Sequence, residues 1–97
     1  MTRAERRRFY YSEVKRLTAE KNVERRYGHT LDHVVPVSFG FKHEIPPKLI
    51  ASRENLQLIP FQQNLAKSSR MTAEAIALLE TWGLFDLAFT EMYKLKR

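Results

Sequence analysis

The central segment of this chain, residues 34–54, restricts the fold most because it has no sustained apolar periodicity. Pro36, Gly40, Pro46 and Pro47 interrupt it at short intervals, and such residues end or bend helices and strands. We predict an irregular loop of about twenty residues, a length that is uncommon in small domains and is usually either disordered or functional. Apolar side chains along the segment should hold it against a core: Val35, Val37, Phe39, Phe41, Ile45, Leu49 and Ile50.

Short regular elements are predicted on either side of this loop. One strand is expected over residues 27–32 and a second over residues 56–59, which Pro60 ends. A helix over about residues 61–68 follows. The residues expected to pack in this helix are Phe61 and Leu65. The neighbouring face of the helix, with Asn64, is then free for chemistry.

Helices are predicted at both ends of the chain. In residues 2–21, Thr2 and Glu5 have the spacing of a capping box. The apolar stripe of this helix consists of Tyr10, Val14 and Leu17. Thr72 can cap a further helix that Gly83 ends, and a last helix follows. The residues expected to pack in these two helices are Ala75, Leu78, Leu79, Trp82, Leu84, Phe85, Ala88, Phe89 and Met92. Together with the strands, these helices predict an α+β fold.

The length of the chain sets its organisation. A chain of 97 residues buries only roughly 60–65% of its unfolded surface, which allows one modest core. No repeat, low-complexity tract or Gly/Ser linker divides the sequence. We therefore predict a single domain with a basic helix in residues 1–26, a core in residues 27–70 and stabilising helices in residues 71–97.

The charge is positive and unevenly distributed. The formal net charge is +6, and the pI is near 9.9. Residues 1–26 hold nine Lys or Arg against four Glu, whereas residues 71–97 hold three against four acidic residues. This balance suits a polyanionic partner such as nucleic acid, with a solvated helix face as the alternative. The candidate contacts near the N-terminus are Arg6, Arg7, Arg25 and Arg26.

Composition excludes several classes of protein. There is no cysteine, which removes disulfides, thiolate nucleophiles and cysteine-rich zinc sites. No apolar run approaches the roughly 18 residues of a membrane span, and the N-terminal arginines are not followed by the apolar stretch of a secretory signal. We expect a soluble, cytoplasmic protein with no membrane partner, in which His, carboxylate or amide groups hold any metal.

Three short motifs follow one another in the central region. They are Asp32-His33-Val34-Val35-Pro36, then Asn55-Leu56-Gln57-Leu58-Ile59-Pro60, then Asn64-Leu65-Ala66-Lys67. Together they resemble the HNH endonuclease family, in which an acidic residue or His precedes the catalytic His and an apolar-x-Pro follows it. In that family an Asn-Leu pair opens the second strand, and His or Asn lies on the next helix with Lys three residues later. The resemblance covers residues 31–67, without the Cys pairs that bind structural zinc in some members.

The resemblance implies a ββα-metal fold, also called a His-Me finger: two short antiparallel strands and a helix laid across both. It implies that His33 is the general base and that Asp32 and Asn64 bind one divalent metal ion. Asn64 stands where other members have His. Asn55 would tether the loop that carries His33 through hydrogen bonds to the backbone, although an Asn that simply caps a turn would make similar contacts.

These residue types suit the hydrolysis of a phosphodiester. A His with a pKa of about 6.5 is largely neutral at physiological pH and can accept a proton from water, while a metal stabilises the phosphate and the leaving alkoxide. One carboxylate and one amide oxygen favour Mg²⁺, with Mn²⁺ as the alternative, and hold it weakly until substrate phosphate binds. Lys67 and Arg70 would contact phosphates, or else form a solvated helix end.

The adjacent positions of Asp32 and His33 raise a geometric difficulty. Neighbouring strand residues point to opposite faces, so both can serve one site only if the strand ends between them. We therefore predict that Asp32 is the last strand residue and that His33 turns into the loop. His29 and His43 are by default surface or half-packed side chains. The alternative places His29 near the scissile bond and His43 against DNA.

These features predict a magnesium-dependent endonuclease acting on double-stranded DNA, similar to the compact stand-alone HNH proteins that phages and mobile elements encode. One alternative is an HNH-fold DNA-binding or assembly module without turnover. Another is a basic RNA-binding protein, which the N-terminal arginines alone support. Because the sequence has no evident sequence-reading module, we expect loose target choice or a protein partner that directs it.

Overall fold

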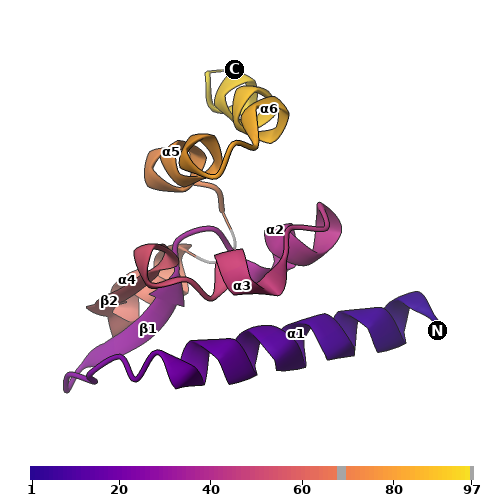
Figure 1. The fold of residues 1–97 in the computed structure, drawn as a ribbon. Coiled ribbons are helices and arrows are strands. Elements are labelled where there is room, and N and C mark those ends of the chain that lie inside the picture. Colours follow the sequence, from indigo (N-terminus) through magenta and orange to yellow (C-terminus); the bar gives the residue numbers. More distant parts are fainter. Residues whose placement is uncertain (68–69, 97) are drawn as a thin grey trace.

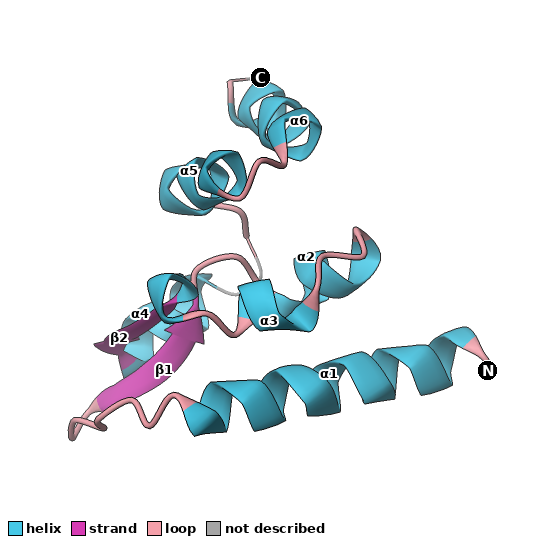
Figure 2. Cartoon of the chain, viewed as in Figure 1, coloured by secondary structure: helices cyan, strands magenta, loops and turns pink. Residues whose placement is uncertain are grey.

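Six α-helices and a two-stranded sheet make up the described part of the chain, which the computed structural model covers as residues 1–67 and 70–96. The elements, in order, are α1 (Arg3–Glu20), β1 (His29–His33), α2 (Val37–Lys42), α3 (Pro47–Ile50), the 3₁₀-helix η1 (Arg53–Asn55), β2 (Leu56–Pro60), α4 (Phe61–Lys67), α5 (Ala73–Thr81) and α6 (Phe85–Leu95). Figure 1 shows α1 running along one side of the molecule, with α5 and α6 on the other side. The small sheet among many helices (Figure 2) confirms the α+β class.

The start of α1 agrees with the sequence prediction. The backbone N–H of Thr2 donates to Glu5 Oε1 at 2.9 Å, and the N–H of Glu5 donates to Thr2 Oγ1 at 3.1 Å. This reciprocal pair is a capping box, which satisfies donors that the first helical turn leaves unpaired. The predicted apolar stripe also packs, since Val14 is buried and Tyr10 and Leu17 lie against the same core.

The sheet pairs β1 with β2 in an antiparallel register. Asp32 lies opposite Gln57, and His33 lies opposite Leu56. The strand therefore continues through His33, and the prediction that Asp32 is its last residue is wrong. The reason is that β2 begins directly after Asn55 and supplies a partner for His33 in the ladder.

α4 follows β2 without an intervening loop and contacts both strands. The N–H of Phe61 donates to the carbonyl of Gly28, just before β1, at 3.1 Å. Phe61 and Leu65 are 57% and 66% exposed, so the prediction that these two residues form the packing face is wrong. Because α4 starts at the residue after β2, the strand and the Gly28 hydrogen bond set its rotation. The predicted last residue of this helix, Ser68, lies outside the described residues.

The segment over residues 34–54 is more regular than the sequence predicted. It contains α2, α3 and η1, so the prediction of an irregular loop is wrong. Pro36 and Pro46 occupy the N-cap positions of α2 and α3, and Pro47 is the first residue of α3. At such positions the missing N–H of proline would have had no partner within the helix. The prolines therefore begin short helices here instead of preventing them.

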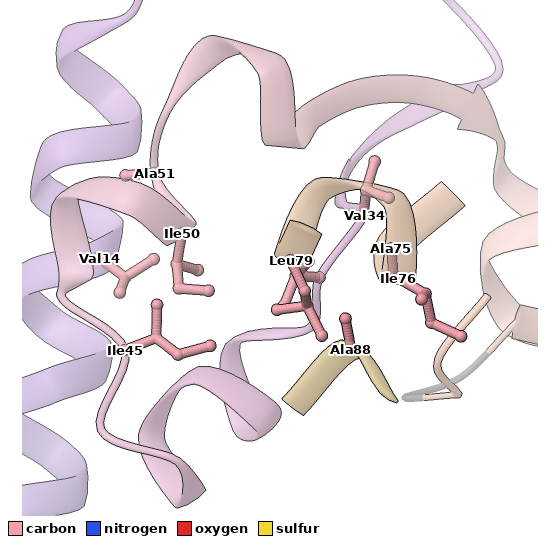
Figure 3. Close-up of a cluster of buried hydrophobic side chains, with 10 residues drawn as sticks. Val14, Val34, Ile45, Ile50, Ala51, Ala75, Ile76, Leu79 and Ala88 are labelled. Atoms are coloured by element: carbon pink, nitrogen blue, oxygen red, sulfur yellow. The ribbon is translucent and has the colours of Figure 1, made fainter. Parts of the chain in front are cut away.

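The first part of the core lies between α1 and the short helices. Val14, Ile45 and Ile50 are at most 2% exposed, and their side chains gather between α1 and α3 (Figure 3). The hydroxyl of Tyr10 donates to the carbonyl of Ile45 at 2.6 Å. A Cβ added to Gly40 would stand 2.7 Å from Cγ1 of Ile50, which explains why glycine fits this close approach between α2 and α3. The apolar side chains of the central segment thus tie it down, as predicted.

α5 is fixed at both ends and joined to η1. The N–H of Ala75 donates to Thr72 Oγ1 at 3.2 Å, which is the predicted N-terminal cap. Gly83 follows the helix with a φ of +78°, a conformation that glycine adopts without strain. The indole N–H of Trp82 donates to Glu54 Oε1 at 2.7 Å. This last contact links the C-terminal helices to the segment that leads into β2.

α5 and α6 pack on each other and extend the core. Figure 3 shows Leu79 and Ala88 close together, with Val34 beside the α5 residues. In α6, however, Phe85 and Phe89 are 66% and 72% exposed. The prediction that both phenylalanines pack is therefore wrong, because in this short helix the smaller Ala88 meets α5 and the aromatic side faces outward.

No helix in the described ranges combines the length and the apolar character needed to cross a bilayer.

Candidate active site

Asp32 and His33 leave β1 on opposite faces of the sheet, because successive strand side chains alternate. Asp32 is 7% exposed and shares its face with Gln57, whose Nε2 donates to Asp32 Oδ2 at 2.9 Å. His33 shares its face with Leu56 and turns toward α1, where its Nε2 lies 3.1 Å from Oγ1 of Thr18. The two candidate residues therefore meet different parts of the protein although they are neighbours in the chain.

α4 covers the face of the sheet that carries Asp32. Gln57, the cross-strand partner of Asp32, lines one hollow together with Gln63 of α4 and with Arg70. Asn64, the next residue in α4, is half-buried. The carboxylate of Asp32 and the helix that carries Asn64 thus lie on the same side of the sheet.

Asn55 is fully buried and fastens the chain that leaves β1. Its Oδ1 accepts from the N–H of Val35 at 2.7 Å, and its Nδ2 donates to the carbonyls of Val35 and Ile50 at 3.1 and 2.8 Å. Its own carbonyl accepts from the N–H of Val34 at 2.8 Å. These contacts with the backbone are the kind the sequence led us to expect, and they fix the turn directly after His33. A catalytic role for Asn55 stays a prediction.

The oxygen donors on the α4 side suit a hard divalent cation. Asp32 offers a carboxylate and Asn64 an amide oxygen, and Mg²⁺ and Mn²⁺ prefer such ligands. Within residues 1–67 and 70–96, no three His, Asp or Glu side chains gather as a metal-binding group. A site built on Asp32 and Asn64 would therefore rely on water and substrate oxygens for the rest of its coordination sphere. The chemistry of the pair fits the expected metal.

His33 forms part of the wall of an open groove of about 640 Å³ beside α1. The groove also contains Thr18, Lys15 and Arg25. The contact between Thr18 and His33 can run in either direction, because an imidazole nitrogen either donates or accepts according to the tautomer. Thr18 is buried, so its hydroxyl is held in place by the packing of α1.

The other two histidines lie away from this groove wall. His29 begins β1, and its Nδ1 lies 3.1 Å from the carbonyl of Tyr27. It lies four residue steps along the strand from His33, a distance of roughly 13 Å. The ring centroid of His43 lies 4.3 Å from that of Phe39. Burial, followed by the charge of Lys42, lowers the pKa of His43, which favours its neutral form.

The cationic candidates lie in separate places. The described ones with exposed side chains are Arg6, Arg7, Arg25, Arg26 and Arg70. Arg7 lies over the ring of Tyr11, 4.7 Å from its centroid. Arg25 lines the groove beside His33, whereas Arg70 lines the hollow beside Gln57. The backbone of Lys67 ends α4, but its side chain lies outside the described part of the structure.

Two residues at this site were not identified from the sequence. Gln57 could have been found from the strand register, because a cross-strand neighbour of Asp32 has to be a residue near the middle of β2. Thr18 gave no local signal, since it lies 15 residues before His33 in a different element. Only the packing of α1 against the sheet reveals it.

Comparison of the chain with protein-family models, with curated proteins and with solved structures found no match.

Proposed function

We propose that the protein is a metal-dependent DNA endonuclease of the HNH type, with β1, β2 and α4 as its ββα-metal core. The observation that supports this most is the arrangement around the end of β1. Asp32 is buried on the α4 side, His33 follows it directly, and Asn55 fastens Val34 and Val35 through three hydrogen bonds. A carboxylate and an imidazole on neighbouring residues, at the end of a strand whose following turn is fixed, are groups that can take part in hydrolysis.

In this proposal His33 accepts the proton of the attacking water. Nε2 of His33 lies 3.1 Å from Oγ1 of Thr18, which fixes the orientation of the ring. Asp32 and Asn64 would hold one Mg²⁺ or Mn²⁺ ion, which when bound stabilises charge on the phosphate and on the leaving alkoxide. The Cα atoms of Asp32 and His33 are about 3.8 Å apart because the residues are adjacent. A phosphodiester that lies across the end of β1 could therefore approach Asp32 on one face of the strand and His33 on the other.

The substrate in this proposal is double-stranded DNA, and the place of action is the cytoplasm. Binding would depend on phosphate contacts, because Lys and Arg attract nucleic acid regardless of sequence. The cations proposed for these contacts are Arg6, Arg7, Arg25, Arg26, Lys67 and Arg70. Because the sequence has no evident sequence-reading module, we expect little selectivity for DNA sequence, or a protein partner that directs the enzyme to its target.

Cleavage of supercoiled plasmid DNA tests the proposal. We expect nicked or linear product with Mg²⁺ or Mn²⁺, none with EDTA, and a loss of at least about 100-fold in rate for His33→Ala. Lys48→Ala is the control, because Lys48 is exposed on α3 and has no role in the proposal. Equal cleavage by His33→Ala and the parent protein would refute the assignment of the base.

Metal binding can be tested without turnover. Electron paramagnetic resonance of Mn²⁺ reports the bound fraction directly, and we expect weak binding that DNA strengthens, because substrate oxygens complete the coordination sphere. Asp32→Ala should abolish that strengthening, whereas Gln62→Ala, on the exposed part of α4, should not. Unchanged Mn²⁺ binding in Asp32→Ala would remove Asp32 from the metal site.

A second candidate is a DNA-binding or assembly module that hydrolyses nothing. The observation in its favour is that Asp32 and His33 face opposite sides of the sheet and that Thr18 bonds Nε2 of His33. Inactivity with every metal, together with salt-sensitive binding of duplex DNA, would support this candidate. Preference for RNA over duplex DNA would instead indicate an RNA-binding protein.

A further inference from the structure

We infer that the groove beside α1 binds the phosphate backbone of one DNA strand and leads it to His33. This inference rests on the proposed nuclease function and names where its substrate lies. The groove has a volume of about 640 Å³, and His33 forms part of its wall. Its volume falls in the range of typical ligand sites, roughly 300–1,000 Å³.

The α1 side of the groove carries a row of polar groups beside the apolar Val14 and Ala19. Tyr11, Lys15, Thr18 and Asn22 all line it. Tyr11, Lys15 and Thr18 follow one another at intervals of four and three residues, which places them along one face of α1, and Asn22 lies just beyond the end of the helix. At about 1.5 Å per residue the stretch from Tyr11 to Thr18 is roughly 10 Å long. One strand of duplex DNA advances about 3.4 Å per nucleotide along the helix axis, so this stretch matches about three nucleotides.

The charge of the groove suits phosphates. Lys15 and Arg25 line it, both are exposed, and no Asp or Glu is among the described residues that form its wall. Arg7 extends the cationic line at the Tyr11 end, where its Nη2 donates to the Tyr11 hydroxyl at 3.3 Å. Cations beside a wall that holds no carboxylate among its described residues are suited to a chain of phosphates.

The position of His33 indicates where along the groove the reacting phosphate would lie. Thr18 sits near the middle of the row of polar groups and holds the imidazole at 3.1 Å. Lys15 precedes Thr18 by one helical turn, and Arg25 lies in the connection between α1 and β1. A strand in the groove would therefore have a cation on either side of the phosphate that meets His33. Lys15 and Arg25 thus position the substrate, while the chemistry belongs to the end of β1.

The second large hollow on α1 is a weaker candidate for this role. It has a volume of about 490 Å³ near the N-terminus and contains Arg3 and Arg6. Its wall also includes Glu44, whose carboxylate would repel a phosphate. It contains none of the candidate catalytic residues.

DNA binding measured in EDTA tests the inference independently of cleavage. The probe is a short fluorescent duplex, and the readout is the slope of log K against log salt concentration. We expect Lys15→Ala/Arg25→Ala to weaken binding at least about tenfold and to reduce the slope by roughly 0.9 for each cation removed. The control is Lys48→Ala/Lys96→Ala, which removes the same charge from exposed positions outside the groove. Thermal melting by circular dichroism verifies that all variants are folded.

The outcomes separate the two proposals. If the groove variant shows weaker binding and a smaller salt slope while the control keeps both values, the groove is the DNA-binding path, and a failure to cleave would then count against the proposed function alone. If both variants change equally, the effect is one of net charge and the groove is not the path. Unchanged binding by the groove variant, or a parent protein that does not bind duplex DNA, also overturns it.

Discussion

Oγ1 of Thr18 and Nε2 of His33 lie 3.1 Å apart, which joins α1 to the strand that carries the proposed general base. Thr18 is 8% exposed, so its hydroxyl has little freedom to turn toward solvent. α1 therefore does more than carry positive charge. It packs on the core through Val14. Four residues further along the same helix, Thr18 presents its buried hydroxyl to the imidazole of His33.

Thr18→Val should reduce cleavage through its effect on His33 alone. The substitution keeps the shape and removes the hydroxyl, and one hydrogen bond contributes about 1 kcal/mol, which corresponds to roughly fivefold in kcat. KM should stay unchanged, and Thr18→Ser should retain activity. Long-range ¹⁵N NMR of the imidazole should show a changed tautomer balance in the Val variant. Equal losses for Val and Ser, with an unchanged NMR pattern, would mean that the contact serves packing only.

Asn55→Ala should destabilise the fold strongly. It removes three side-chain hydrogen bonds and leaves the buried N–H of Val35 without its partner, for which we expect about 3 kcal/mol. Urea unfolding at neutral pH measures the change. Gln62→Ala on exposed α4 should shift the midpoint little. A loss below about 1 kcal/mol would show that water replaces the amide, and the fastening role of Asn55 would be lost.

Tyr10→Phe should lower the free energy of unfolding at neutral pH, and this loss should become smaller at alkaline pH. It removes the hydrogen bond to the Ile45 carbonyl, for which we expect about 1 kcal/mol. Burial, and next the neighbouring Tyr11, raises the pKa of Tyr10 to about 12, whereas an unfolded tyrosine ionises near pH 10. Tyr10 therefore stays protonated to a higher pH in the native state than in the unfolded state. Its contribution to the free energy of unfolding is fully present below pH 10 and is lost as the pH rises toward 12.

Denaturant melts of the two proteins at several pH values test this dependence. The difference in unfolding free energy between the parent and Tyr10→Phe should be constant from pH 7 to about 9 and should shrink from about pH 10 upward. Other groups that titrate in this range are common to both proteins and cancel in the difference. A gap that widens above pH 10 would contradict the assigned burial of the phenol.

Gly40→Ala should destabilise the protein by about 1–3 kcal/mol, because the added Cβ would stand 2.7 Å from Cγ1 and 2.9 Å from Cδ1 of Ile50. Thermal unfolding measures the loss, and Ser38→Ala in the same helix is the control. Ile50→Val removes Cδ1, so the double variant should lose less than the sum of the two single losses. Strict additivity would show that the crowding comes from the Tyr10 hydroxyl, which also lies against the added Cβ, and not from Cδ1 of Ile50.

Several features could be predicted from the sequence because they depend on neighbours in the chain. The Thr2–Glu5 capping box, the Thr72 cap and the turn at Gly83 need only local spacing and backbone conformation. Alternation along β1 likewise follows from residue order, and it raised the difficulty that Asp32 and His33 would point to opposite faces. The prediction that the strand ends at Asp32 to avoid this was wrong, because His33 still pairs with Leu56.

Other features were decided by contacts between distant segments. The sequence could not show that His33 meets Thr18, that α4 turns Phe61 outward, or that Pro46 and Pro47 begin a helix that packs on Val14. Each depends on where α1 and the strands lie in space, and the free energy of such packing exceeds the small local preferences that a sequence pattern reports. Residue order thus determined the elements and their caps, whereas tertiary packing determined which faces meet and which wall of the molecule His33 joins.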